Sequence, residues 1–85
     1  MWATAYTHTG NRTATGTWPE VGTVAVDPKV IPLGTRLWVE GYGWGTALDT
    51  GRLIRGRRID VFMPSRAEAL EWGRKRVRVR IYAGR

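Results

Sequence analysis

Apolar and β-branched residues occur along this chain in short runs that glycines, prolines and polar turn formers separate. Short runs with this punctuation are typical of β-strands, because a helix needs a longer stretch of apolar periodicity. Alternation is clearest near the C-terminal end, where Val77, Val79 and Ile81 share one side of an extended segment. That side is expected in the core, and the arginine side faces solvent or, alternatively, a ligand. The pattern predicts six strands, over residues 2–7, 23–26, 36–40, 46–49, 59–62 and 77–83.

One segment, PSRAEALEWG, predicts a helix of about two turns instead. Ser65 can cap its N-terminus, and Glu68 three residues later completes a capping box. Gly73 suits its C-terminal end. Six short strands, one helix and many bends in 85 residues indicate a single domain over residues 1–85, folded as a small closed β-barrel. Closure removes the sheet edges that such a small domain would otherwise expose.

The net charge of +7 comes almost entirely from arginine and changes the expected partner rather than the fold. It favours an anionic polymer, either nucleic acid or an acidic polysaccharide of a cell envelope, although a compositional bias toward arginine also explains it. No run approaches the ~20 apolar residues of a membrane span, and no signal peptide is visible. The chain is therefore expected to be either cytoplasmic as made or a mature domain of a longer secreted protein.

Several kinds of chemistry have no support in the composition. The chain has no cysteine, which excludes disulfides and thiolate metal sites. The only histidine, His8, stands beside a polar loop with no serine or cysteine nucleophile placed to use it. We therefore expect no cofactor and no metal. A divalent cation among the aspartates remains a weak alternative, because Mg²⁺ and Ca²⁺ prefer oxygen ligands.

The only three aspartates of this basic chain are the candidates for catalysis: Asp27, Asp49 and Asp60. Asp27 precedes Pro28, and Asp49 precedes Thr50 and a glycine, so both aspartates can serve turns as well as a site. Asp60 stands in the middle of a predicted strand, where charged residues are uncommon. A turn does not explain Asp60, and this favours a functional role.

The aspartates stand in the stretches VAVDP, ALDTG and RIDVF, which accompany IPLGTRLWVEGYG and EWGRKRVRVRIY. In these stretches the chain closely resembles the three-aspartate (3D) domain of bacterial cell-wall proteins, from about Ala3 to Ile81. The resemblance implies a double-psi β-barrel related to membrane-bound lytic transglycosylase A, to expansins and to stationary-phase survival proteins. It implies lytic transglycosylase activity on peptidoglycan glycan strands. It also implies an extracytoplasmic or cell-wall location in a bacterium.

The resemblance also assigns roles to residues. Asp60 matches the acid–base aspartate of the family, and Asp27 and Asp49 match its supporting cluster. The early stretch ATAY matches one that contributes Thr4 and Tyr6 to the cleft.

The sequence departs from the family after Asp49, where the family reads Asp-Thr-Gly-Gly-Ala-Ile-Lys-Gly. Arg52 and Leu53 replace the second glycine and the alanine, and Arg55 stands for the lysine. Arginine at position 52 removes the backbone freedom of a glycine and can change the width of the cleft.

A lytic transglycosylase needs one carboxyl group that gives a proton to the leaving oxygen and then takes one from the C6 hydroxyl of the substrate. An ordinary aspartic acid, with a pKa near 3.9, loses its proton well below neutral pH. Burial or a nearby second carboxylate raises that pKa. We therefore expect Asp60 to be the acid and then the base, with Asp49 on an adjacent strand sharing a proton with it. Asp27 either tunes the pair or holds Thr50 and the loop amides.

Aromatic and arginine side chains are the candidates for binding a sugar chain, which needs flat faces and hydrogen-bond donors. Among five tryptophans and three tyrosines, Tyr42 and Trp44 flank glycines in an expected bend, as sugar platforms or as loop anchors. Trp38 and Trp72 are expected in the core. Arg52 and Arg55 either grip carboxylates of the substrate or are solvated surface.

Three functions compete at this point. The first is a lytic transglycosylase, and the second is an expansin-like module that binds wall polysaccharide without cleaving it. A cleft that Arg52 makes too narrow for the glycan would favour the second. The third, nucleic-acid binding, rests on charge alone. Acidic residues converging on one cleft would repel phosphates, so the expected partner is peptidoglycan and not nucleic acid. The oligomeric state is unknown from the sequence.

Overall fold

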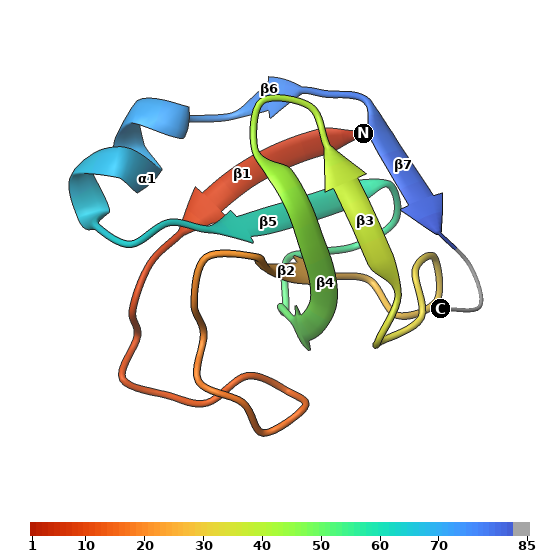
Figure 1. Ribbon diagram of the computed structural model, residues 1–85, viewed down its shortest axis with the longest axis horizontal. Coiled ribbons are helices and arrows are strands. Elements are labelled where there is room, and N and C mark those ends of the chain that lie inside the picture. The colour runs from red at the N-terminus through yellow and green to blue at the C-terminus, as the bar shows by residue number, and fades with distance from the viewer. Residues whose placement is uncertain (83–85) are drawn as a thin grey trace.

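The computed structural model describes residues 1–82, which contain seven strands and one helix joined by loops (Figure 1). The expected class, mainly β with one short helix, is confirmed, but the count of six strands is wrong. In chain order the elements are β1 (Trp2–Tyr6), β2 (Thr23–Val26), β3 (Arg36–Val39), β4 (Gly43–Thr50), β5 (Arg58–Phe62), α1 (Arg66–Trp72), β6 (Lys75–Arg76) and β7 (Val79–Tyr82). None of the helices in this part of the chain is both long and apolar enough to cross a membrane.

The strands form one curled sheet in the order β6-β1-β5-β2-β4-β3-β7. Its two edge strands follow each other in the sequence, because β6 pairs with β1 and β7 pairs with β3. One stretch of chain therefore joins the two ends of the sheet. The single C-terminal strand expected over residues 77–83 is therefore wrong, because the chain passes from one sheet edge to the other between β6 and β7. At this point Met1 and Val77 exchange two hydrogen bonds of 2.9 Å. Ala83 lies outside the described residues.

The core fills the inner face of this sheet, as strand alternation predicts for Val77, but the core position expected for Ile81 is wrong, because Ile81 is 44% exposed on the edge strand β7. Fully buried inner residues come from five of the seven strands, and Trp72 of α1 closes one side with its indole N–H donating to the Ala3 carbonyl at 3.3 Å. The core position predicted for Trp72 is confirmed. The same prediction for Trp38 is wrong, because Leu37 and Val39 take the inner positions of β3 and leave Trp38 facing outward.

Helix α1 begins and ends as its capping residues predict. The Ser65 hydroxyl accepts a hydrogen bond from the Glu68 amide at 3.2 Å and donates to the Glu68 carboxylate at 2.8 Å. Gly73 ends the helix at a φ of 68°, a conformation that side chains rarely adopt. The Ser65 half of the capping box is therefore confirmed, while the Glu68 carboxylate bonds to the Ser65 hydroxyl instead of its backbone N–H.

A bulge in β4 decides which way Asp49 points. In the parallel pair of β2 and β4, Val24 faces Ala47 and the next residue, Ala25, faces Asp49, so Leu48 is an extra residue. Residues two apart in a regular strand share a face. Here Ala47 is buried in the core, whereas Asp49 pairs with Ala25 on the opposite face of the sheet. Bulges often redirect a side chain in this way beside functional sites.

Candidate functional site

Four residues form one row across four neighbouring strands on the outer face of the sheet. Thr4 of β1 is the partner of Asp60 in β5, Asp60 is the partner of Ala25 in β2, and Ala25 is the partner of Asp49 in β4. The expectation that Asp49 lies on the strand next to Asp60 is therefore wrong. Strand β2 lies between them and separates their Cα atoms by about 10 Å, two strand spacings.

Asp60 is a partly buried carboxyl group with one side-chain donor. The Thr4 hydroxyl donates to Asp60 Oδ1 at 3.1 Å. Burial raises the pKa of Asp60 above its ordinary value, while the Thr4 hydrogen bond and the charge of Arg58 act against this rise. The charge of Asp49 adds a smaller upward contribution to the pKa. Asp60 therefore keeps its proton to higher pH mainly because of burial rather than because of a second carboxylate.

Asp49 fastens a long loop over this row. The loop, residues 7–22, is called the long loop below, and Figure 1 shows it below the C-terminal end of β4. The amides of Ala14 and Thr50 both donate to Asp49 Oδ1 at 2.9 Å, and the Tyr6 hydroxyl donates to Oδ2 at 3.4 Å. Burial, with the charges of Asp49 and Asp60, raises the pKa of Tyr6, so its hydroxyl remains a donor.

Asp27 lies apart from the row and organises a different loop. Its Oδ2 accepts a hydrogen bond from the Gly56 amide at 2.7 Å and its Oδ1 accepts one from the Lys29 amide at 3.0 Å. These two hydrogen bonds hold the pKa of Asp27 below its ordinary value. The loop amide that Asp27 holds is thus that of Gly56, not Thr50. Within residues 1–82, no three acidic or histidine side chains lie close enough to hold a metal ion.

Three adjoining cavities make up what we call the aspartate groove. The central cavity, of about 250 Å³, is lined by Asp49, Asp60 and Tyr6. It shares Thr50 and Gly51 with a cavity of about 320 Å³, the arginine end. On the other side it shares residues of the long loop with a cavity of about 290 Å³, the tryptophan end. The arginine end is lined by Asp27, Arg52 and Arg55, and the tryptophan end by His8, Asn11, Trp18 and Pro19.

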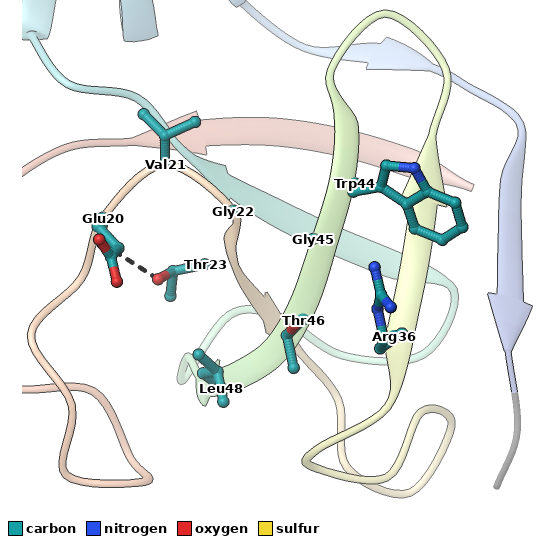
Figure 2. Close-up of a pocket in the computed structure, with 9 residues that line it drawn as sticks. All are labelled: Glu20, Val21, Gly22, Thr23, Arg36, Trp44, Gly45, Thr46 and Leu48. Atoms are coloured by element: carbon teal, nitrogen blue, oxygen red, sulfur yellow. Dashed lines mark hydrogen bonds between the residues drawn. The ribbon is translucent and has the colours of Figure 1, made fainter. Parts of the chain in front are cut away.

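Most of the residues predicted from sequence meet in this groove. The Thr4 hydroxyl bonds to Asp60 and the Tyr6 hydroxyl bonds to Asp49, as two separate pairs. Thr50 lines two of the cavities. Trp44 does not join them. It lies on the outer face of β4 beside a separate pocket, which Figure 2 shows.

Tyr42 is a loop anchor and does not line the aspartate groove. Its hydroxyl accepts from the Gly22 amide at 2.8 Å and donates to the Phe62 carbonyl at 2.7 Å. Its ring contacts Trp72 edge-on at 6.1 Å. Of the two alternatives that the sequence leaves open for Tyr42, these contacts favour the anchor.

Trp18 and Arg12 of the long loop are groove residues that sequence reasoning missed. Trp18 is 57% exposed, and the Arg12 guanidinium lies 4.5 Å from its ring centre. The long loop carries no hydrophobic period, so pattern analysis treats it only as a connection. A tryptophan followed by proline inside a polar loop was the one available signal.

We expect Tyr42→Phe to lower the free energy of unfolding by about 1–3 kcal/mol, because it leaves a partly buried amide and a carbonyl without their shared partner. Denaturant unfolding measures this change. Unchanged stability in Tyr42→Phe would contradict the anchor role of Tyr42.

The shifted pKa values of Asp60 and Asp27 predict opposite pH dependences of stability. Between the ordinary aspartate pKa of 3.8 and the raised folded value, folded Asp60 keeps a proton that the unfolded chain releases, so its contribution to stability is lost as the pH rises. Asp60→Asn should therefore gain stability relative to wild type as the pH rises through this interval. Asp27 has a lowered pKa, so its contribution is present above 3.8 and lost as the pH falls.

The matched variant Asp27→Asn should accordingly lose stability relative to wild type at neutral pH and recover toward acid. Urea unfolding at a series of pH values on both sides of 3.8 tests both variants. Differences from wild type that follow the pH in the same direction for the two variants would contradict the assignment.

Comparison with known proteins gives one family match and relatives that are named for the cell wall. The family model of the 3D domain matches residues 22–83. The cell wall-binding protein YocH of Bacillus subtilis is 54% identical over 63 residues, 74% of this chain and 22% of that protein. The putative cell wall shaping protein YabE of the same organism is 46% identical over 87 aligned positions, 93% of this chain and 21% of that protein.

A solved structure is similar over most of this chain. The crystal structure of MltA from E. coli matches 84% of this chain and 27% of that chain, with a TM-score of 0.68 and 25% sequence identity. The chain spans only about a fifth of the length of YocH and YabE. The family model covers well over half of the sequence and confirms the resemblance found in the motifs. The chain therefore belongs to the 3D domain family.

Proposed function

We propose that this chain is a peptidoglycan lytic transglycosylase domain. It cleaves the bond between N-acetylmuramic acid (MurNAc) and N-acetylglucosamine (GlcNAc) and leaves a 1,6-anhydro-MurNAc end. The observation that carries this proposal is the carboxyl group of Asp60, which is partly buried, has a raised pKa and opens into a groove. A carboxyl group with these properties is suited to general acid catalysis nearer neutral pH. Membership of the 3D family and the sheet shared with MltA support a substrate in the cell wall.

One carboxyl group is enough for both halves of the reaction. Protonated Asp60 gives its proton to the glycosidic oxygen as the bond from C1 to that oxygen breaks, which releases the GlcNAc side with a free hydroxyl. The Asp60 carboxylate then takes the proton of the C6 hydroxyl while the C6 oxygen bonds to C1. The anhydro ring is closed without water, and Asp60 ends in its starting, protonated form. A hydrolase would instead need a second carboxyl group to serve as base or nucleophile.

The neighbours of Asp60 have supporting roles in this proposal. Thr4 orients the carboxyl group through its hydrogen bond to Oδ1. Asp49 and Tyr6 keep the long loop over the groove, and the negative charge of Asp49 favours the positive charge that develops on the sugar ring. Arg52 and Arg55 bind the lactyl or peptide carboxylates of the substrate at the arginine end.

The fold and the location follow from the same proposal. The sheet is a double-psi β-barrel whose ring is completed by the segment Lys75–Tyr82, which forms β6 at one edge and β7 at the other. Support comes from the two parallel pairs, β1 with β5 and β2 with β4. Further support comes from the C-terminal segment, whose β6 pairs with β1 and whose β7 pairs with β3. Since peptidoglycan lies outside the cytoplasmic membrane, the domain acts in the extracytoplasmic space or in the wall of a bacterium.

A binding module that does not cleave is the second candidate. The relative YocH is named as a cell wall-binding protein, and this favours attachment as a function of the shared domain. In that case the groove would hold a glycan strand through Trp18 at one end and arginines at the other, with Asp60 as a hydrogen-bonding group only.

Digestion of purified sacculi followed by mass analysis of the soluble fragments tests the proposal. Fragments with 1,6-anhydro-MurNAc ends are the expected result. Fragments with reducing ends would indicate a hydrolase. Protein that sediments with sacculi but releases no fragment would indicate the binding module and would overturn the transglycosylase.

A further inference from the structure

A second set of aromatic and arginine side chains lies on the open outer face of β4, β3 and β7. Cross-strand partners share a face of the sheet, so the register places them side by side. Trp38 is the partner of both Trp44 and Arg80, and in the next row Arg36 is the partner of Tyr82. We call these five residues the aromatic platform: Arg36, Trp38, Trp44, Arg80 and Tyr82.

Two of the three platform rings, those of Trp44 and Tyr82, are held by neighbours, and all three remain open to solvent. The Trp44 and Tyr82 ring centres are 5.2 Å apart at an angle of 50°, and the Arg36 guanidinium lies 4.7 Å from the Trp44 ring centre. Trp44 is nevertheless 52% exposed, Tyr82 41% and Trp38 36%. Aromatic side chains that neighbours already orient lose little conformational freedom when they bind a ligand.

A cavity of about 200 Å³ adjoins the platform, and Figure 2 shows Trp44 and Arg36 on one side of it. Glu20 and Val21 of the long loop line the opposite side. This cavity shares no lining residue with the three cavities of the aspartate groove. The long loop is fastened between them, since Thr15 bonds to the Leu48 carbonyl and Ala14 to Asp49. The platform and the groove are therefore separate surfaces.

We propose that the aromatic platform is a second binding surface for a peptidoglycan glycan strand, one that works independently of the aspartate groove. The identity of the ligand rests on the proposed function. The exposed rings offer flat faces to the C–H faces of pyranose rings, and Arg36 and Arg80 offer guanidinium groups to lactyl and peptide carboxylates. The net charge of +7 complements such an acidic strand.

Two separate surfaces suit a protein that works on an insoluble polymer. A strand held on the platform raises the effective concentration of neighbouring glycan at the groove, so that two weak contacts give one firm attachment. The platform also keeps the protein on the wall after the groove has released its product.

Sedimentation of the full chain with purified sacculi tests the proposal, with sacculi from which anionic phosphodiester polymers have been stripped. Trp44→Ala should weaken binding at least about fivefold, as truncation of an important interface residue does. Arg80→Gln should also weaken it and removes no packed ring, so it remains informative if Trp44→Ala unfolds. Trp2→Ala is the matched control. Trp2 resembles Trp44 in being 42% exposed with an arginine guanidinium, that of Arg74, 4.8 Å from its ring centre, but it stands on β1 outside the platform. Trp2→Ala should bind as the wild type does.

Four results would overturn the platform: unchanged affinity in both Trp44→Ala and Arg80→Gln, an equal loss in Trp2→Ala, binding only to unstripped sacculi, or a dimer that Trp44→Ala dissociates. Fragment release measured in the same samples keeps the two proposals apart. Binding that depends on Trp44, without anhydro fragments, would refute the transglycosylase and support the platform. Anhydro release with binding that neither variant changes would refute the platform alone.

Discussion

Asp60→Asn is expected to lower the release of anhydro-muropeptides from sacculi by at least about 100-fold, within the range that a general acid–base group contributes. Asparagine has nearly the same size and still accepts the hydrogen bond that Thr4 donates to Oδ1, so the groove keeps its shape. Its amide cannot give a proton to the glycosidic oxygen or take one from the C6 hydroxyl. Liquid chromatography with mass detection of the released fragments measures the rate.

Asp27→Asn is the matched control for this substitution. It makes the same chemical change at a carboxylate that binds only loop amides outside the central cavity. Release should change far less than in Asp60→Asn. The wild-type rate should also fall as the pH rises through the raised pKa of Asp60, because the acid must be protonated. Release by Asp60→Asn at the wild-type rate would remove Asp60 from the mechanism.

Ala25→Leu is expected to lower fragment release by a similar factor through a steric effect. Ala25 stands between Asp60 and Asp49 in the row and lines the central cavity, with only 4% of its surface exposed. A leucine side chain at this position extends into the space where the scissile bond would lie. The added side chain also costs about 1–3 kcal/mol of stability if its neighbours resist it.

Ala25→Ser serves as the control, because serine is nearly as small as alanine and should retain most of the release. Thermal unfolding verifies that both variants are folded, and the release assay compares them. The leucine variant should still sediment with sacculi through the aromatic platform. A folded leucine variant that releases fragments as fast as the serine variant would show that the substrate does not pass between Asp60 and Asp49.

The strands and the helix were largely readable from local patterns. Alternation located the strand around Asp60, and the Ser65 and Glu68 pair located the start of the helix. The motifs around the three aspartates were enough for the family. The strand and helix signals each lie within about ten residues of sequence, where side-chain direction and capping are decided by neighbours along the chain. The family match instead draws on motifs from about Ala3 to Ile81.

The arrangement of the aspartates needed the tertiary structure. The bulge at Leu48 turns Asp49 away from the core, and β2 separates it from Asp60 by one strand. Strand order and bulges depend on partners far apart in the chain, and the row joins Thr4 to Asp60 across 56 residues. A pattern read along one strand holds no information on which strand will lie beside it.

The sequence by itself determined the mainly β class, the helix caps, the family and Asp60 as the candidate acid. Only the tertiary structure decided that Asp27 fastens a separate loop, that Tyr42 anchors rather than lines the groove, and that Trp18 belongs to the groove. It also decided that the C-terminal segment divides between two sheet edges. The physical reason is that faces, caps and turns follow from local chemistry, whereas register, loop placement and burial follow from long-range packing.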